Sequence, residues 1–235
     1  MAWHEHEQRV SPVGRERRSI PAPAAARRKR TPRAGPRSKR DQILAVATDY
    51  FGRYGYEETK WADVAAAVGI GPTALYHYFE SKQHCLYEIM SRGIATTRER
   101  FDRIVTAESD WDRALAALLD AGFDLSATDV LEHQVLLAEQ GRLDTRRSSA
   151  RSEAARKDVG ARRRDYEAAW AAFLVRGMEK DALPATDPLL LARALLGLYN
   201  SVWTWYRPGG TLSLADVRRF VVSRERALLG CREAR

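Results

Sequence analysis

Cysteine is scarce in this chain of 235 residues, which contains only Cys85 and Cys231. Two cysteines cannot build the disulfide framework that stabilises many small secreted proteins. The chain also lacks an uninterrupted run of about 18 apolar residues, so no transmembrane helix is expected. Its basic N-terminal region is not followed by the apolar segment of a secretory signal. These absences predict a cytoplasmic protein that does not use a membrane.

Motifs typical of enzymes and metal sites are missing as well. The chain contains no Gly-x-Ser-x-Gly, no glycine-rich phosphate loop and no His-Glu-x-x-His. The histidines are scattered without the spacing of metal ligands: His4, His6, His77, His84 and His133. We therefore expect no enzymatic activity, no cofactor and no bound metal.

The alternating pattern of a β-strand is also absent, whereas apolar residues recur at helical spacing along most of the chain. An all-α fold is therefore expected. Thr59 and Ser81 are the expected N-caps of the second and fourth helices, and Gly55 follows the end of the first. The pattern predicts helices near residues 38–54, 59–68, 73–79, 82–106, 110–126, 128–141, 148–180, 187–206 and 213–229.

The net charge of +8 is unevenly distributed. Residues 1–40 contain twelve Lys or Arg and three acidic residues, whereas the remainder of the chain has a net charge of −1. Five of the nine prolines lie within residues 12–36. This composition predicts a disordered basic arm over residues 1–37, outside the folded part of the chain. We hypothesise that residues 27–40 add salt-dependent affinity for nucleic acid, the alternative being a solvated tail without a role.

Residues 59–79 have the length and the central glycines of a helix-turn-helix, whose second helix enters the major groove of DNA. On that expected second helix, Leu75 and Phe79 are predicted to face inward. The outward positions are Thr73, Ala74, His77 and Tyr78. Short side chains at such positions permit close approach to base edges. On spacing alone, a small helical domain with partly buried aromatic residues remains an alternative.

A more specific pattern extends across residues 40–90. Its members are Ile43-Leu44, Phe51, Gly55-Tyr56, Thr59, Asp63-Val64-Ala65, Gly69, Leu75-Tyr76-His77-Tyr78-Phe79 and Ser81-Lys82. This segment closely resembles the DNA-binding domain of the TetR family of transcriptional regulators. The resemblance implies a homodimer that binds operator DNA until a small ligand relieves binding. It also implies a three-helix DNA-binding domain over residues 38–84 and a helical ligand-binding and dimerisation domain over residues 85–235.

The resemblance assigns DNA contacts to individual positions. It implies phosphate contacts for Thr59, Lys60 and Lys82. It implies contacts to bases, groove walls or backbone for Thr73, Ala74, Tyr76, His77 and Tyr78. The family often has Ser or Thr where this chain has Gly71, which provides no hydroxyl for a phosphate.

The C-terminal half indicates dimerisation and an effector. Residues 187–206 are apolar nearly all round and residues 213–229 carry an apolar face, which favours an intersubunit helix bundle over a monomer core. Residues 194–213 resemble the corresponding region of TetR-type repressors of fatty-acid and steroid breakdown, several of which respond to acyl-CoA thioesters. An acyl-CoA needs an apolar tunnel and a basic entrance. The candidates are Phe123, Leu136, Trp170, Phe173, Tyr199 and Trp203 for the tunnel and Arg163 for the entrance.

Simpler interpretations remain for these residues, namely core packing for the aromatic side chains and a solvated helix face for the arginine. The functional hypothesis is a ligand-responsive repressor of lipid or steroid catabolism genes. One alternative is a repressor of an efflux pump that responds to a drug-like hydrophobic ligand. Another is a nucleoid-type DNA-binding protein without an effector.

Overall fold

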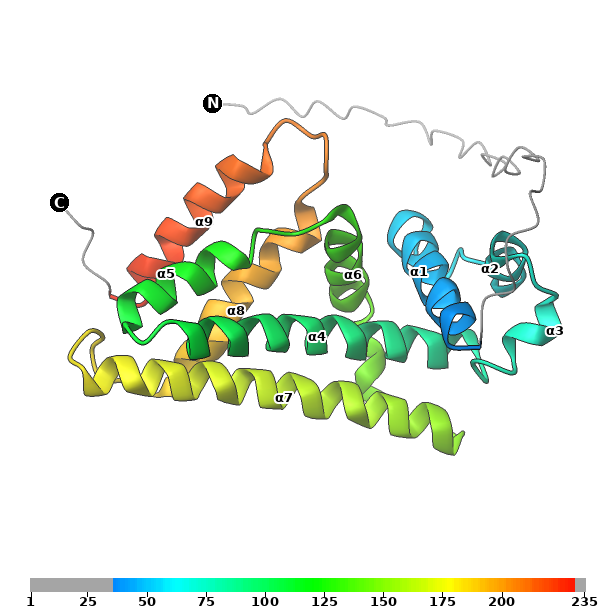
Figure 1. The fold of residues 1–235 in the computed structure, drawn as a ribbon, viewed down its shortest axis with the longest axis horizontal. Helices are drawn as coiled ribbons and strands as arrows, with labels where there is room; N and C mark the ends of the chain where they lie inside the picture. Colours follow the sequence, from blue (N-terminus) through cyan, green and yellow to red (C-terminus); the bar gives the residue numbers. More distant parts are fainter. Residues whose placement is uncertain (1–35, 231–235) are drawn as a thin grey trace, which may run out of the picture. The chain divides into compact units, whose positions relative to one another are not determined.

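The computed structural model describes residues 36–230, and within them the chain is helical throughout its regular structure. Figure 1 shows the order of the elements. They are α1 (Pro36–Tyr54), α2 (Trp61–Val68), α3 (Pro72–Leu75), α4 (Lys82–Ala107), α5 (Trp111–Ala121), α6 (Ala127–Ala138), the 3₁₀ helix η1 (Gln140–Asp144), α7 (Ala150–Glu179), α8 (Pro188–Trp205) and α9 (Leu214–Leu228). The all-α prediction is confirmed. The predicted arm lies outside the described residues except for positions 36 and 37, which belong to α1, and Cys231 also lies outside them.

Most of the expected boundaries agree with the structure. Gly55 follows α1 with φ +87°, and the Ser81 hydroxyl caps α4 by accepting the His84 N–H at 3.0 Å. The predicted helix over residues 110–126 is too long, because α5 ends at Ala121. The predicted helix over residues 73–79 is also too long. Beyond Leu75 the backbone tightens into turns in which the His77 N–H bonds to the carbonyl three residues earlier.

The predicted DNA-binding part, which comprises α1, α2 and α3, is a small helical unit whose core includes the N-terminal half of α4. Buried side chains from α1, α2, α3 and α4 meet in one cluster, with Phe79 and Leu75 fully enclosed. Trp61 and Phe79 pack edge to face with ring centres 6.4 Å apart. The predicted inward positions of Leu75 and Phe79 are therefore confirmed. Cys85 is fully buried in the same cluster.

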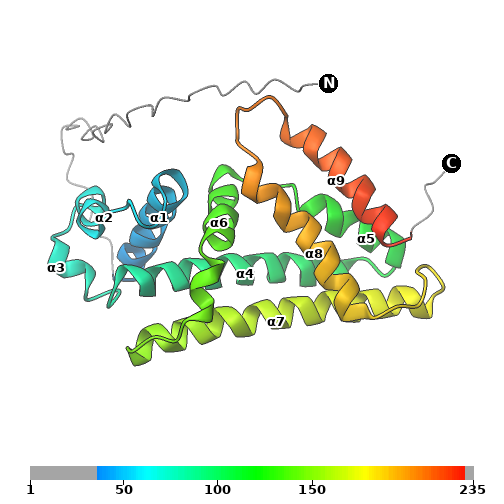
Figure 2. The same cartoon turned by 180° about the vertical axis from the view of Figure 1, so that it is seen from behind.

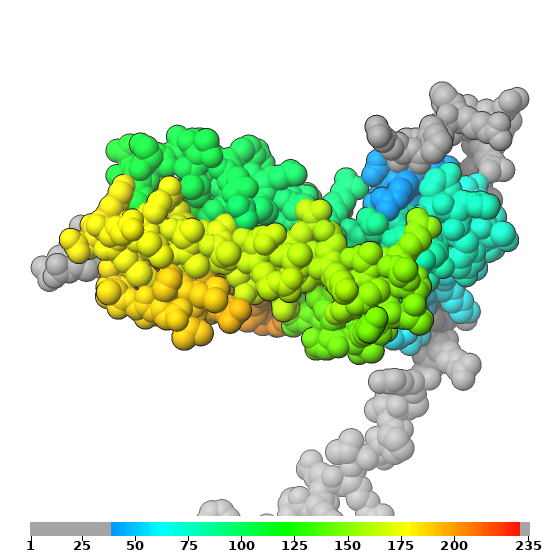
Figure 3. Space-filling model, turned by 90° about the horizontal axis from the view of Figure 1, so that it is seen from below, coloured from blue at the N-terminus to red at the C-terminus, as the bar shows by residue number. Residues whose placement is uncertain are grey.

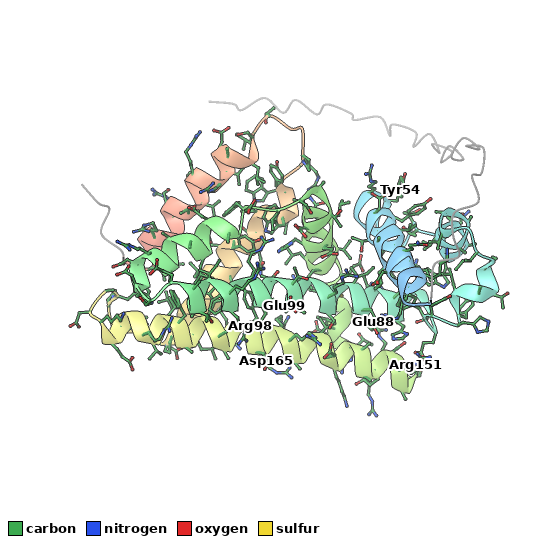
Figure 4. All side chains as sticks on the ribbon, in the orientation of Figure 1. Tyr54, Glu88, Arg98, Glu99, Arg151 and Asp165 are labelled. Carbon is green, nitrogen blue, oxygen red and sulfur yellow. The ribbon has the colours of Figure 1, made fainter. Side chains whose placement is uncertain are left out.

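The larger part is organised around α4 and α7, which lie side by side along most of their length (Figures 1 and 2). Seen from below, α7 crosses the face, with α5 on one side and α8 on the other (Figure 3). Arg98 of α4 donates to the backbone oxygen of Asp165 in α7 at 2.9 Å (Figure 4). A second core cluster fills the space between α4, α5, α7 and α8, and there the Trp111 indole donates to the Phe173 carbonyl at 2.9 Å. α4 is therefore one continuous helix whose N-terminal half packs in the core of the DNA-binding part and whose C-terminal half packs in the second core cluster.

None of the described helices combines the length and apolarity that a bilayer crossing requires.

Candidate DNA-binding surface and effector pocket

The helix-turn-helix consists of α2, a tight turn and α3. Gly69 adopts φ +74°, and the next amide, that of Ile70, reaches back to the Ala65 carbonyl at 3.0 Å. This is a Schellman-type end, and the left-handed conformation at its centre favours glycine. Pro72 begins α3, where its missing N–H leaves no helical hydrogen bond unmade. The turn therefore sets the direction of α3 through backbone geometry.

The side chains predicted to meet DNA are largely accessible. Thr73, Tyr76 and His77 are exposed, and Ala74 and Tyr78 are half-buried. All five lie on or just after α3, above the fully buried Leu75 and Phe79. The apolar core beneath fixes their backbone, so their exposed groups are available for contacts to base edges and phosphates.

The structure corrects the expectation for Thr59. Its side chain is only 3 % exposed, and its hydroxyl lies within hydrogen-bonding distance of the Gly55 and Tyr50 carbonyls, at 2.8 and 3.2 Å. The N-cap position of α2 belongs to Lys60, without a side-chain hydrogen bond. Thr59 therefore closes the connection between α1 and α2 and does not present its hydroxyl to a phosphate.

Lys82 also has an internal role. Its ammonium donates to the carbonyls of Tyr56 and Thr59 at 2.6 and 2.9 Å and lies 4.2 Å from the centre of the Tyr56 ring. Burial lowers the pKa of Lys82. An ammonium has three protons, and a third carbonyl, that of Glu57, lies at 3.4 Å. The predicted phosphate contact thus competes with bonds inside the protein, whereas exposed Lys60 has no such bonds to the residues that the structure describes.

Two basic residues from the predicted DNA-binding stretch 27–40 are also engaged by the folded chain. Lys39 donates to the Val68 carbonyl at 3.2 Å, which ties α1 to the end of α2. Arg40 pairs with Glu88 at 2.9 Å and lies 4.8 Å from the centre of the Phe79 ring. The hypothesis that residues 27–40 add salt-dependent affinity for nucleic acid therefore now concerns the basic residues that precede α1.

Polar contacts join the DNA-binding part to η1 and α7. Glu80, directly after the buried Phe79, accepts hydrogen bonds from the Ser149 hydroxyl and the Ser152 amide at the start of α7. These bonds, that of Ser149 foremost, lower the pKa of Glu80. On the other side, Arg142 of η1 pairs with Glu57 and stacks over the Tyr56 ring at 4.4 Å. A movement of η1 or α7 would therefore displace Glu57, which precedes the helix-turn-helix, or Glu80, which follows it.

Two adjoining cavities lie between α4, α6, α7 and α8. The larger is about 210 Å³ and the smaller, which also reaches α5 and α9, is about 60 Å³. They share lining residues from all four helices: Gly93, Thr97, Glu132, His133, Tyr166, Leu196 and Tyr199. Apolar surface predominates in both linings. A preformed apolar cavity with a few polar groups is the usual form of a small-molecule site.

Polar groups occupy distinct ends of this pocket. Arg163 and Arg193 line the larger cavity, are more than half exposed, and lie 3.8 and 2.9 Å from the carboxylate of Glu167. At the boundary between the cavities, the Tyr199 hydroxyl donates to the Gly122 carbonyl at 2.8 Å and lies 3.3 Å from His133 Nε2. Burial lowers the pKa of His133, which favours a neutral imidazole. The exposed end thus carries two arginines against one glutamate.

The predicted effector residues fall into two groups. Leu136, Tyr199 and Arg163 line the larger cavity, and Trp170 lines the smaller cavity together with Tyr199. Phe173, Phe123 and Trp203 belong to core clusters instead and line neither cavity. Phe173 stacks on Trp111 with ring centres 5.3 Å apart, and this packing buries its ring in the core.

The sequence reasoning identified Arg163 and Tyr199 but missed the other ionisable residues of the lining. Glu132 and His133 on α6, Arg193 on α8 and Glu225 on α9 all contribute to it. Glu225 is the clearest omission, because it is the acidic residue among the buried polar side chains of α9, next to apolar Val221 and Leu229. An acid on the apolar face of an amphipathic helix is a sequence signal that could have identified it.

The comparisons with known proteins agree with this geometry. Residues 43–89 match the family described as "Bacterial regulatory proteins, tetR family". Residues 115–224 match "Tetracyclin repressor-like, C-terminal domain", and the two matches together cover about two thirds of the chain.

The chain belongs to the TetR family of DNA-binding transcriptional regulators.

Individual members of the TetR family are similar over most of the chain. "HTH-type transcriptional repressor KstR2" of Mycolicibacterium smegmatis is 26% identical over 190 residues, 77% of this chain and 86% of its own. The structure of "ketosteroid transcriptional regulator KstR2" of Mycobacterium tuberculosis superposes with TM-score 0.65 at 25% identity, covering 82% of this chain and 93% of that one. AibR "in complex with isovaleryl coenzyme A and operator DNA" has TM-score 0.66 at 21% identity, covering 79% and 97%. That last similarity shows the shared fold.

Proposed function

We propose that this TetR-family protein is a homodimeric repressor that binds operator DNA and is released by an acyl-CoA-type effector of lipid or steroid catabolism. The main support for this proposal is the pocket formed by the two adjoining cavities. Its large apolar cavity suits an acyl group, and the arginines at its exposed end suit phosphates. The similarity to repressors named KstR2, and the isovaleryl coenzyme A in complex with AibR, support the same effector class. In this proposal residues 38–84 bind DNA, and residues 85–235 bind the effector and dimerise.

Two helices provide the physical connection between pocket and DNA. α4 contributes Gly93, Thr97 and Arg100 to the cavity linings and Cys85 and Leu86 to the core of the DNA-binding part. A ligand that displaces α4 therefore displaces α2 and α3. Effector binding would favour a conformation in which the two recognition surfaces of the dimer have the wrong spacing for DNA.

The second connection runs through α6. Glu132 and His133 face the cavities, while the neighbouring Leu131 packs against Gly52 of α1. A Cβ atom at position 52 would lie 2.6 Å from Leu131 Cδ2, so the close approach of the two helices depends on glycine. Displacement of α6 by a ligand is therefore transmitted directly to α1.

The exposed apolar surface of α8 and α9 supports the homodimer. Leu190 and Trp205 of α8 and Phe220 of α9 are 62, 49 and 65 % exposed. Small exposed residues, Ala194 and Gly197, lie between them on α8 and permit close approach of another helix. Other apolar residues expected at this interface, including Val217, Val221 and Leu229, are buried within the chain itself. Phe220→Glu should therefore shift the protein to monomers in analytical ultracentrifugation and abolish tight operator binding.

Operator release tests the effector class. A footprint on DNA upstream of the protein's own gene would define the operator, and fluorescence anisotropy would follow release by a panel of acyl-CoAs. Coenzyme A alone and the free fatty acids are the matched ligand controls. The double variant Arg163→Ala with Arg193→Ala should weaken the response, whereas Arg164→Ala, at an exposed position outside both linings, should not. Release by apolar drugs alone would favour the efflux-pump alternative, and no ligand effect would favour the nucleoid-type alternative.

The basic residues before α1 supply a separate part of DNA affinity in this proposal. Residues 38–90 hold five basic and seven acidic residues, so the DNA-binding part provides little net attraction for phosphates. Removal of residues 1–35 should flatten the dependence of log K on log salt, because fewer counterions are released on binding. An unchanged slope would exclude this role for the basic stretch.

A further inference from the structure

Glu225 of α9 lies at the inner end of the pocket, where no described residue forms a hydrogen bond or ion pair with its carboxyl group. Its side chain is 2 % exposed, and it lines the smaller cavity. Its Oε2 atom is buried and has no hydrogen-bond partner among the described residues. The indole N–H of Trp170, which lines the same cavity from α7, is also buried and makes no hydrogen bond of standard geometry with those residues. Its polar neighbour is the Tyr166 hydroxyl, whose pKa is raised by burial and lowered to a smaller extent by the Trp170 N–H. The indole N–H groups of Trp61 and Trp203 are likewise buried without partners among the described residues but line neither cavity, so Glu225 is the distinguishing observation. A buried carboxyl without a partner costs stability, and its retention at a cavity points to a ligand that satisfies it.

The surroundings of Glu225 offer no compensating cation among the described residues. Arg100 of α4 lines the same cavity, but it donates to the Ala121 and Asp124 carbonyls at 3.0 and 2.8 Å. The other titratable groups of this lining are Asp129, Glu132 and His133 of α6, Tyr166 of α7 and Tyr199 of α8. Burial is the resolved cause that raises the pKa of Glu225 to about 8. At neutral pH the carboxyl group therefore retains its proton and can donate as well as accept a hydrogen bond.

We propose that the smaller cavity binds an uncharged oxygen group, a ketone or a hydroxyl, at the end of the effector's acyl group remote from the thioester, with Glu225 and Trp170 as its hydrogen-bond partners. This inference rests on the proposed acyl-CoA effector, whose phosphates occupy the arginine end of the larger cavity. The smaller cavity, about 60 Å³, has room for the end of a ligand and little more. A protonated carboxyl and an indole N–H both donate to a ketone or hydroxyl oxygen.

Other ligand ends fit this cavity less well. A hydrocarbon end would leave both polar groups buried without partners. An ammonium end would find Glu225 uncharged, and Asp129 and Glu132, the other acids of this lining, are accompanied by the Arg100 cation. A carboxylate end would lose its hydration, while the Arg100 donors are already bound to backbone carbonyls. The contrast between the two cavities therefore assigns phosphate recognition to one end and neutral oxygen recognition to the other.

Matched ligand pairs test the proposal. Calorimetry would compare octanoyl- and dodecanoyl-CoA with their ω-hydroxy and ω-oxo forms on the full-length wild type, Glu225→Leu, Glu225→Gln and the control Glu99→Gln. Glu99 is exposed on α4 and lies outside both linings (Figure 4). The wild type and the control should prefer the oxygenated ligands by about tenfold, which corresponds to one good hydrogen bond. Glu225→Leu should lose this preference, and Glu225→Gln, which keeps a donor, should retain part of it. Circular dichroism would show that each variant is folded.

The outcomes separate this inference from the function on which it rests. Equal binding of plain and oxygenated acyl-CoAs by the wild type would overturn the inference and leave the effector class intact. A preference that persists in Glu225→Leu would also overturn it. If no thioester binds but dodecane-1,12-diol binds to the wild type and not to Glu225→Leu, the acyl-CoA proposal fails and the oxygen site stands. If neither class binds, both proposals are wrong.

Discussion

The DNA-binding part and the candidate effector pocket differ in how their buried polar side chains are satisfied. In the DNA-binding part, the hydroxyl of Thr59 and the ammonium of Lys82 contact backbone carbonyls, and buried His84 accepts the Glu80 N–H at 3.3 Å. In the pocket, Glu225 and Trp170 retain buried polar atoms without partners among the described residues. The DNA-binding part satisfies these groups within the chain, although the Trp61 indole N–H is also buried there without a partner among the described residues. The pocket differs in that its unsatisfied groups include a carboxyl and line a cavity.

This difference corresponds to the tasks proposed for the two regions. A surface that recognises DNA must keep its backbone geometry, so internal hydrogen bonds that fix the connections around α2 and α3 are useful there. A pocket that shifts a conformational equilibrium needs interactions that are made only when the ligand is present. Substitutions that remove either kind of group test whether this division is real.

The largest effect is expected from the pH dependence of stability at Glu225. The unfolded carboxyl ionises at its ordinary pKa near 4.5, whereas burial raises the folded value to about 8. The native state therefore binds more protons between these values, and stability falls as pH rises through this window. At roughly 1.4 kcal/mol per pKa unit, the unfolding free energy of Glu225→Gln relative to wild type should increase by about 3 kcal/mol from pH 5 to pH 8.

Urea unfolding at the two pH values provides the measurement, and Glu99→Gln serves as the control on the surface of α4. The control should follow the wild type at both pH values. A Glu225→Gln curve parallel to the wild type would mean that Glu225 is solvated or paired in solution, and the contrast between the two regions would then lose its main support.

The next effect separates two lysines of the DNA-binding part. Lys82→Met removes the donor for the Tyr56 and Thr59 carbonyls and should cost about 2–3 kcal/mol of unfolding free energy. Lys60→Met, at an exposed position, should leave stability unchanged. Lys60→Met should instead weaken operator binding and reduce the salt slope by about 1. If both variants showed the same pattern, the distinction between a structural lysine and a DNA-binding lysine would be wrong.

Much of the fold was predictable because its determinants are local. Helical spacing, Ser81 as a cap and Gly55 after α1 are signals that lie within a few residues of the feature they specify. The end of α3 was not predictable in the same way. Tyr76 and His77 continue the helical pattern, but the chain must turn there to place Phe79 in the core beside Trp61.

The site residues show the same limit more strongly. Exposed positions such as Thr73 and His77 follow from the helical face opposite Leu75. The role of Lys82 depends on carbonyls more than twenty residues away, and Thr59 is buried by α1. For the pocket, aromatic character did not separate Trp170, which lines a cavity, from Phe173, which fills the core. The two residues can be told apart only when the packing of α5 against α7 is known, and a local sequence pattern does not specify that packing.

Coupling between the regions is tested at Gly52. Gly52→Ala places a Cβ 2.6 Å from Leu131 and should push α6 away from α1, at a cost of about 1–2 kcal/mol. The expected result is weaker operator binding without effector and a smaller further loss when effector is added, because the substitution shifts α6 in advance. Gly141→Ala, where the added Cβ meets open space, is the matched control. An unchanged ratio of operator affinities with and without effector would exclude α6 as a route of coupling.

The smallest effect is expected at the DNA surface itself, at His77. His77→Ala removes an exposed side chain above the buried Leu75, so the unfolding free energy and effector affinity should stay unchanged. Operator affinity should fall about tenfold, because one contact to a base or phosphate is lost. Anisotropy titrations against the operator and a scrambled duplex distinguish the two kinds of contact. A base contact lowers only operator affinity, whereas a phosphate contact lowers both equally. A stability loss in His77→Ala would show that this surface, like Lys82, is part of the internal structure.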